Sequence, residues 1–312
     1  MRAARKQQSG ATAYEACLAW ARTLVAFFIL TVSTSVASAS SPLVSAEWVL
    51  SNLGSEDVVF VDLQPVNGYA RVHLPNAVNT QYGQWRQRRP VKGKALPDIA
   101  YLEKLLGSLG IKPTDHIVLT PIGMNAGEIA VATRIYWTLK VIGHEKVSIL
   151  DGGLIAYSRL PKPIFTKQMT RVRATKYTAN PNPAMAPSMD DVLTAWKKGM
   201  AIFDYRSHEE YVGKAGGPRP GTIPGAQNLP FDQLVEPKQG GKFLTLERAK
   251  ALFSTQGMDP MQAHIGFCNS GHRASLAWFV THELLGNKQG LLYDGSMAEW
   301  QQYPDNPIAV PK

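Results

Sequence analysis

The sequence predicts an α/β protein of two similar domains, each a mostly parallel sheet with helices on both faces. The first observation behind this prediction is that short, almost wholly apolar runs such as 117–119 and 147–150 alternate with stretches of helical periodicity. Such runs are typical of strands buried on both faces of a parallel sheet. The second is that landmarks of the first half recur in the second at about the length of one domain, which indicates a duplicated domain rather than a short-period solenoid.

The repeat follows the chain through four pairs of segments. Each segment lies at the start or the end of an expected strand, and the four segments occur in the same order in both halves. A strand that ends in aspartate is expected at 58–62 and at 201–204, and a turn with the pattern Pro-x-Ala-x-Asn follows at 72–79 and at 222–228. A second strand is expected at 116–120 and at 264–268, and an Asp-Gly turn follows at 149–153 and at 292–296. Strands joined by helical segments in this order predict two α/β units.

One helix is expected in each half between the last two strands of the repeat. Residues 126–142 carry apolar residues at spacings of three and four and end at Gly143. Residues 275–285 do the same and end at Gly286, and glycine is common just beyond the end of a helix. Proline and asparagine are frequent between the halves, at 179–187, which indicates an extended linker. We therefore expect domains at 40–165 and 188–312, joined by a linker at 166–187.

The first 39 residues have the pattern of a secretory signal peptide. A basic start precedes an apolar run at 23–32, and small residues end at Ala37-Ser38-Ala39. The run is shorter than the roughly 20 residues of a spanning helix, although an uncleaved anchor is the alternative. We expect cleavage after Ala39, export to a bacterial periplasm, and no stable membrane span afterwards. Cys17 would leave with this segment.

Composition excludes several classes of protein. With 45% apolar and 18% charged residues, the chain is not typical of disordered proteins. Its two cysteines are too few for a disulfide framework, a four-thiolate zinc site or an iron–sulfur cluster held by cysteines alone. We expect no metal or cofactor. The net charge of +9 includes a basic stretch at 86–94, interpreted as solvated surface or, alternatively, as an entrance for anions. No nucleic-acid motif accompanies it.

The candidate site is the segment Cys268-Asn269-Ser270-Gly271-His272-Arg273, which lies between an expected strand and an expected helix. In such a loop the backbone N–H groups can surround an anion, and the helix N-terminus adds positive potential. Arg273 adds a full charge. These features favour the thiolate of Cys268, which is the nucleophilic form of cysteine.

These residues resemble the active-site loop of the rhodanese family of sulfurtransferases. So do Asp204-Tyr205-Arg206, the Gly-Thr-Ile-Pro-Gly-Ala at 221–226 and the Tyr-Asp-Gly-Ser-x-x-Glu-Trp at 293–300. The resemblance covers essentially the whole chain after residue 39 as two rhodanese domains in tandem. The first domain of such pairs commonly lacks the catalytic cysteine, and Thr120 stands at that position here. The resemblance therefore implies a catalytic second domain and a first domain that contributes the wall of a cleft.

The resemblance also implies a double displacement. The Cys268 thiolate takes the outer sulfur of an anionic donor as a persulfide and passes it to cyanide or a thiol, with an acceptor protein as another possible partner. Arg206 and Arg273 would bind the anionic substrate, together with the loop residues Asn269, Ser270, Gly271 and His272. Asp204 and Arg219 would support them, Arg219 near the entrance.

The donor is interpreted as thiosulfate, with 3-mercaptopyruvate as the alternative. The loop has Ser270 and Gly271 as in mercaptopyruvate enzymes of the family, but His272 and Arg273 bring positive charge, as thiosulfate enzymes do. Lys94-Ala95-Leu96-Pro97 also lacks the histidine expected there in a mercaptopyruvate enzyme.

Two other functions compete with this hypothesis. Phosphatases and arsenate reductases with a related loop have five residues between Cys and Arg, whereas four stand between Cys268 and Arg273, and the tighter ring suits one sulfur atom better. A persulfide carrier without turnover is the second alternative.

Elsewhere Glu209 and Glu210 are interpreted as surface residues, and the tryptophans Trp137, Trp278 and Trp300 as core residues.

Overall fold

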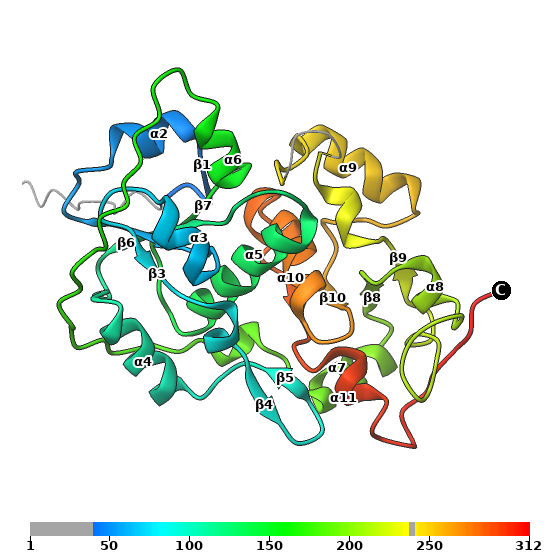
Figure 1. The fold of residues 1–312 in the computed structure, drawn as a ribbon. Coiled ribbons are helices and arrows are strands. Elements are labelled where there is room, and N and C mark those ends of the chain that lie inside the picture. Colours follow the sequence, from blue (N-terminus) through cyan, green and yellow to red (C-terminus); the bar gives the residue numbers. More distant parts are fainter. Residues whose placement is uncertain (1–39, 237–240) are drawn as a thin grey trace, which may run out of the picture. The chain divides into compact units, whose positions relative to one another are not determined.

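The computed structural model describes residues 40–236 and 241–312, so the expected signal peptide and Cys17 lie outside the described residues. The first half contains a five-stranded sheet in which every neighbouring pair is parallel (Figure 1). Its strands lie in the order β1 (Leu43–Val44), β7 (Val147–Leu150), β6 (His116–Thr120), β2 (Val58–Asp62) and β3 (Val78–Asn79). The strands expected at 58–62, 116–120 and 147–150 are confirmed.

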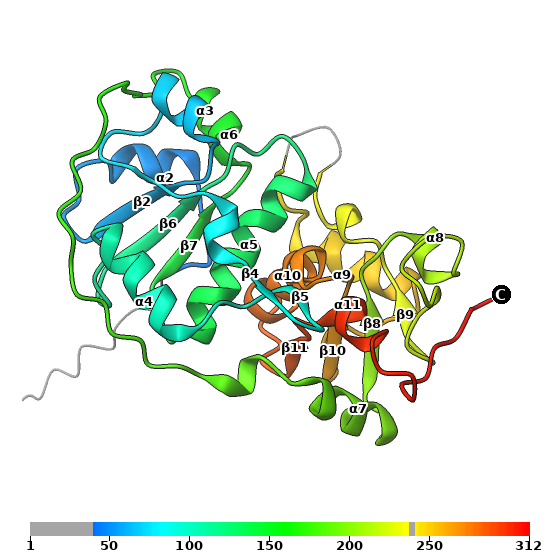
Figure 2. The same cartoon turned by 60° about the horizontal axis from the view of Figure 1, so that its bottom comes forward.

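Helices cover both faces of this sheet (Figure 2). They are α2 (Ala46–Ser51), α3 (Val66–Arg71), α4 (Ile99–Ser108), α5 (Ala126–Val141) and α6 (Gly153–Ser158), with the short 3-10 helix η1 (Tyr82–Trp85). Successive side chains of β6 pack on opposite faces of the sheet. Leu119 belongs to the core formed with α4 and α5, whereas Val118 belongs to the core formed with α2, α3 and α6. Both are fully buried, as the apolar character of the strand predicts.

The second half repeats the arrangement around a four-stranded parallel sheet. Its strands lie in the order β11 (Gly290–Leu292), β10 (His264–Phe267), β8 (Ala201–Asp204) and β9 (Gln227–Asn228). The helices are α7 (Met189–Lys197), α8 (His208–Tyr211), α9 (Leu246–Thr255), α10 (His272–Trp278) and α11 (Ser296–Trp300), with short helical turns η2 (Pro183–Met185), η3 (Phe231–Leu234) and η4 (Phe279–Leu284). Phe203 packs with α9 and α10, whereas Ile202 packs with α7 and α11. The predicted α/β class is thus confirmed for both halves.

The two central helices differ in how well the sequence predicted them. Helix α5 has the expected extent, and Gly143 follows it with a φ of 81°. The second helix begins three residues earlier than expected, at His272, because Gly271 makes the turn out of the loop with a φ of 69°. It continues through the wider turn η4 and is followed by Gly286. The earlier start places Arg273 in the first turn of α10.

The basic stretch at 86–94 has regular structure of its own. It forms an antiparallel hairpin of β4 (Gln87–Arg89) and β5 (Gly93–Ala95), separate from both parallel sheets. The prediction for the tryptophans is confirmed, since Trp137, Trp278 and Trp300 are all buried.

The halves meet along α5 and α10, which lie side by side in both views (Figures 1 and 2). The hydroxyls of Thr133 and Ser275 are 3.0 Å apart at the centre of this contact. Tyr136 donates a hydrogen bond of 2.8 Å to Glu283 near its end. One hydrophobic core includes buried residues of both halves, so the helix expected at 275–285 is packed against the first half. Within 40–236 and 241–312, no helix is both long and apolar enough to cross a bilayer.

Candidate functional site

Cys268 directly follows strand β10 and is 1% exposed. Its backbone N–H donates to the Ser296 hydroxyl at 3.2 Å, and its carbonyl accepts from the Met297 N–H at 3.1 Å. The cysteine is therefore fixed by the turn that begins α11, which follows the neighbouring strand β11. Carboxyl ends of adjacent parallel strands meet at one edge of a sheet, and this edge is a common location for sites in α/β folds.

Ser296 organises the whole loop. Its hydroxyl oxygen accepts from the N–H groups of Cys268 and Gly271, the latter at 3.0 Å, and donates to the Tyr293 carbonyl at 2.8 Å. Ser296 has a φ of 51°, a conformation that costs a residue with a side chain roughly 1–2 kcal/mol. Strained backbone conformations of this kind are frequent at functional sites, where hydrogen bonds to the surrounding residues stabilise them. The sequence marked Ser296 only as part of a motif.

Four other N–H groups of the loop are available to a ligand. The amides of Asn269, Ser270, His272 and Arg273 make no hydrogen bond to any other residue that the structure describes. Free amides clustered in one turn can bind an anion, so the arrangement is compatible with the anion site that the sequence predicts for this segment.

In the corresponding loop of the first half, two amides are bound to a carboxylate of the same half. There the carboxylate of Glu128 accepts hydrogen bonds from the N–H groups of Gly123 and Met124, at 3.1 and 2.9 Å. Thr120, which stands in the position of the cysteine, donates to the Val61 carbonyl. The first domain thus supplies its own anion where the second leaves free N–H groups.

Arg273 makes a two-pronged ion pair with Glu210 of α8. The Arg273 Nη1 and Nη2 atoms lie 2.5 and 2.8 Å from the two carboxylate oxygens. Burial alone would raise the pKa of Glu210, but the hydrogen bonds and charge of Arg273 lower it overall. Interpreting Glu210 as a surface residue was therefore wrong, because the pairing brings together residues 63 positions apart in the chain.

Asp204 and Arg206 form a buried ion pair beneath the loop. Nε and Nη2 of Arg206 donate to the Asp204 carboxylate, and Nη2 also donates to the Gly221 carbonyl at 2.8 Å. The remaining nitrogen, Nη1, has no hydrogen-bond partner within the described chain. Asp204 thus orients Arg206 and leaves one nitrogen for another partner. In the first half, Gln64 takes the place of Arg206 beside Asp62.

Arg219 contacts the C-terminal segment. Its two terminal nitrogens donate to the carbonyls of Tyr303 and Asn306, both at 2.7 Å. The guanidinium group therefore connects the 217–220 turn to the chain that follows α11. Its suggested contribution to an entrance stays a prediction.

The first domain reaches the loop through Tyr82 and Arg86, to which the sequence assigned no role in the site. The Tyr82 hydroxyl lies 2.7 Å from Nδ1 of His272, and Arg86 donates to the Ser270 carbonyl at 2.6 Å. Interpreting Arg86 as solvated surface was wrong. Some 190 residues separate Tyr82 from His272, and only the packing of the two halves brings them together.

Arg134 of α5 forms a second, fully buried connection. It pairs with Asp294 at 2.6 Å, donates to the Gly271 carbonyl at 3.3 Å and lies over the Trp137 ring. The other carboxylate oxygen of Asp294 accepts from the Leu96 N–H at 2.7 Å. The Asp294 turn is thus held on both sides by the first half. Periodicity marks position 134 as part of a buried helix but gives no sign of its partner.

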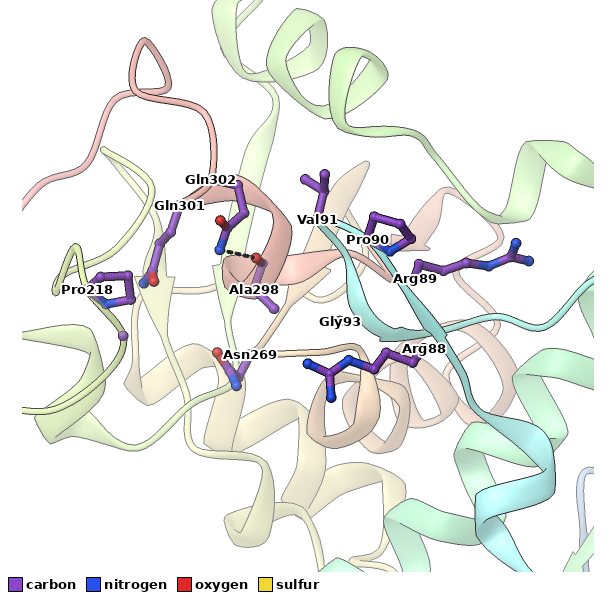
Figure 3. Close-up of a pocket in the computed structure, with 11 residues that line it drawn as sticks. Arg88, Arg89, Pro90, Val91, Gly93, Pro218, Asn269, Ala298, Gln301 and Gln302 are labelled. Carbon is purple, nitrogen blue, oxygen red and sulfur yellow. Dashed lines mark hydrogen bonds between the residues drawn. The ribbon is translucent and has the colours of Figure 1, made fainter.

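A pocket of about 670 Å³ opens beside the loop (Figure 3). Its wall consists of the β4–β5 hairpin, the Gly217-Pro218 turn, Asn269 and one side of α11. Arg88 extends from the hairpin toward Asn269, the residue next to Cys268. No three His, Cys, Asp or Glu side chains within 40–236 and 241–312 are grouped so that they could hold a metal ion.

Comparison with known proteins gives consistent matches. The family model described as "Rhodanese-like domain" matches residues 45–160 and 188–303. A Mycobacterium bovis protein provisionally named thiosulfate sulfurtransferase 1 is 34% identical over 280 residues, covering 86% of this chain and 97% of its own. A Haloferax volcanii protein with the same provisional activity is 32% identical over 286 residues, covering 86% and 96%.

Two solved structures have a similar fold. SseA of Escherichia coli, titled a 3-mercaptopyruvate sulfotransferase, aligns with a TM-score of 0.68 at 25% identity, covering 82% of this chain and 99% of its own. The anaerobic ergothioneine biosynthesis enzyme of Chlorobium limicola aligns with a TM-score of 0.73 at 20% identity, covering 86% and 70%. The second likeness concerns the fold alone.

Proposed function

The chain belongs to the rhodanese family and is a sulfurtransferase, and we propose that it transfers the outer sulfur of thiosulfate to a thiophilic acceptor through a persulfide on Cys268. The observation that carries the proposal is the contrast between the two loops. In the second domain a buried cysteine lies in a turn with four free N–H groups, whereas in the first a threonine precedes a turn in which Glu128 binds two of the N–H groups. Of the two loops, only the second combines a cysteine with free N–H groups and no bound carboxylate of its own.

The reaction has two displacements. The Cys268 thiolate attacks the outer sulfur of thiosulfate, the S–S bond of the donor breaks, and its electron pair leaves with sulfite. The enzyme then carries Cys–S–S⁻. A cyanide ion or a thiolate attacks the outer sulfur and leaves with it, and the Cys268 thiolate is regenerated. No oxidant or reductant is required, because the sulfane sulfur moves between nucleophiles.

Positive groups around the loop match the negative charge of both the donor and the persulfide. The free amides of Asn269, Ser270, His272 and Arg273 would hold the persulfide, because fixed N–H dipoles stabilise an anion without reorganising. Arg206 would use its free Nη1 toward the donor. Arg88 would draw anions into the pocket beside Asn269 (Figure 3).

Turnover of thiosulfate and cyanide to thiocyanate and sulfite tests the proposal. We expect activity in the full chain and its complete loss in Cys268→Ser, which keeps the size of the side chain but not the sulfur. Cys17→Ser is the matched control and should keep full activity. Activity in Cys268→Ser would mean that the proposed nucleophile is wrong.

3-Mercaptopyruvate is a second candidate donor, and the similarity to SseA over 99% of that chain favours testing it. The reaction would leave pyruvate and the same Cys268 persulfide. The ratio of kcat/KM for the two donors decides between them. We expect a higher value for thiosulfate, because Arg88 brings positive charge to the pocket and residues 94–97 lack the histidine expected of a mercaptopyruvate enzyme. A higher value for mercaptopyruvate would reverse the assignment.

A persulfide carrier that hands sulfur to an acceptor protein shares the same first step. Such a carrier would form the persulfide stoichiometrically but would show no turnover with cyanide or small thiols. We also propose export to the periplasm with cleavage after Ala39. Sequencing the N-terminus of the protein from a periplasmic extract tests this, with Ser40 as the expected first residue.

A further inference from the structure

A segment of the first domain makes a connected set of hydrogen bonds to the catalytic loop. Arg86 donates through Nη1 to the Tyr82 hydroxyl at 2.7 Å and through Nη2 to the Ser270 carbonyl at 2.6 Å. The same Tyr82 hydroxyl lies 2.7 Å from Nδ1 of His272. Ser270 and His272 of the loop are therefore both held by one first-domain turn.

The chemistry of these groups fixes where the hydrogens lie. A guanidinium group can only donate, so the Tyr82 oxygen accepts from Arg86. The single hydroxyl hydrogen of Tyr82 then has one acceptor within reach, Nδ1 of His272. If Nδ1 carried the ring hydrogen instead, the hydroxyl hydrogen would have no partner. The assignment that uses every hydrogen leaves His272 protonated on Nε2 alone.

The surroundings of His272 keep its ring neutral. Burial lowers the pKa of His272, and three guanidinium groups lower it further, to about 3. Arg86 and Arg134 come from the first domain, whereas Arg273 lies on the same helix as His272. The other titratable groups near this loop are the Tyr82 hydroxyl, the Cys268 thiol, and the carboxylates of Asp294 and Glu210, which pair with Arg134 and Arg273. A neutral ring is thus expected throughout the range in which an ordinary histidine titrates.

The other ring nitrogen is available to a ligand. Nε2 of His272 makes no hydrogen bond within residues 40–236 and 241–312, and it is not among their buried unpartnered atoms, so it is open to solvent. We propose that Tyr82 and Arg86 of the first domain hold His272 in the Nε2–H form, and that this N–H donates a hydrogen bond to the anionic sulfur donor beside Cys268. Tyr82 is then a positioning residue, and the first domain completes the site. The second part of this inference rests on the proposed function.

Nitrogen-15 NMR of the histidine rings in the full chain tests the tautomer directly. We expect the His272 signals to show the neutral Nε2–H form without change from pH 5 to pH 8, with His272→Gln identifying them by their loss. Tyr82→Phe removes the hydrogen bond to Nδ1 and should give a mixture of the two tautomers. Tyr101→Phe, at an exposed tyrosine of α4, is the matched control and should leave the signals as they are. The Nδ1–H form in the native protein, or titration near pH 6.5, would overturn the assignment.

Steady-state kinetics with thiosulfate test the hydrogen bond to the donor. Loss of one hydrogen bond to a charged acceptor raises KM roughly 10- to 100-fold, so His272→Leu should show this increase with a much smaller change in kcat. His272→Gln, which places an N–H near the position of Nε2, should recover most of it. An unchanged KM in His272→Leu would exclude the hydrogen bond. The NMR result does not depend on turnover, so failure of the proposed function and failure of the tautomer assignment can be told apart.

Discussion

Replacing Gly271 by alanine is expected to destabilise the protein far more than the same change at a glycine of equal conformation. Gly271 has a φ of 69°, and an added Cβ would lie 2.5 Å from Nη1 of Arg134, 2.8 Å from Oδ1 of Asp294 and 3.0 Å from the Asp294 carbonyl oxygen. Arg134 is fully buried and cannot move aside. The contact therefore forces apart the ion pair that joins the two halves.

Gly286 provides the control. Its φ is 80°, and nothing lies within 4 Å of an added Cβ. Gly286→Ala should lower the free energy of unfolding by about 1–2 kcal/mol, the cost of a left-handed conformation for alanine. Gly271→Ala adds the cost of overpacking, about 1–3 kcal/mol. Because the two replacements restrict the unfolded chain equally, the difference between them isolates the contact with Arg134 and Asp294.

Urea unfolding followed by circular dichroism measures both values, and thiosulfate turnover measures the effect on the loop. We expect Gly271→Ala to be the less stable variant by that difference and to lose activity, whereas Gly286→Ala remains active. Equal stability of the two variants would refute the close packing of Gly271 against Arg134.

Contacts in both loops and between the two halves support three further predictions. Thr120→Cys in the Cys268→Ser background should form no persulfide by mass spectrometry, because the Glu128 carboxylate already binds two amides of the first loop and would repel a second anion; a persulfide there would contradict the contrast between the loops. Burial alone would raise the pKa of Glu283, but hydrogen bonds and a nearby ammonium lower it to about 2. The Glu283 carboxylate therefore contributes up to about 3 kcal/mol to the free energy of unfolding above pH 4.5, and this contribution is lost as the pH falls toward 2. Glu283→Gln should make the free energy of unfolding in urea depend less on pH in that range, and an unchanged dependence would exclude this contribution. Arg134→Met leaves the Asp294 carboxylate without its partner and should lower the free energy of unfolding by about 3–5 kcal/mol, and adding Asp294→Asn should recover part of this loss; an additive double variant would exclude the pairing.

Local pattern was enough to predict the sheets and the place of Cys268 at the end of a strand. Strands such as β6 are apolar throughout because both faces are covered, and periodicity at 3–4 residues defined α5. Cys268 was identified because a strand, a glycine-containing loop and a helix follow one another directly in the sequence. Each of these signals extends over fewer than twenty residues.

The contacts between the halves could not be predicted in this way. Tyr82 and Arg134 lie far along the chain from their partners in the loop, and neither carries a motif of its own. Glu210 looked like a surface residue because its partner Arg273 lies in another element. Ser296 was seen as a motif residue, but its two accepted hydrogen bonds depend on the neighbouring strand. Hydrogen bonds and ion pairs of this kind depend on tertiary packing, which a single sequence does not encode locally.

The central claim is that Cys268 carries the transferred sulfur, and mass spectrometry of the protein after incubation with thiosulfate tests it most directly. We expect the peptide that contains Cys268 to gain the mass of one sulfur atom, and to lose it again when cyanide is added. A gain elsewhere in the chain, or an unchanged Cys268 peptide in a protein that still produces thiocyanate, would contradict the mechanism.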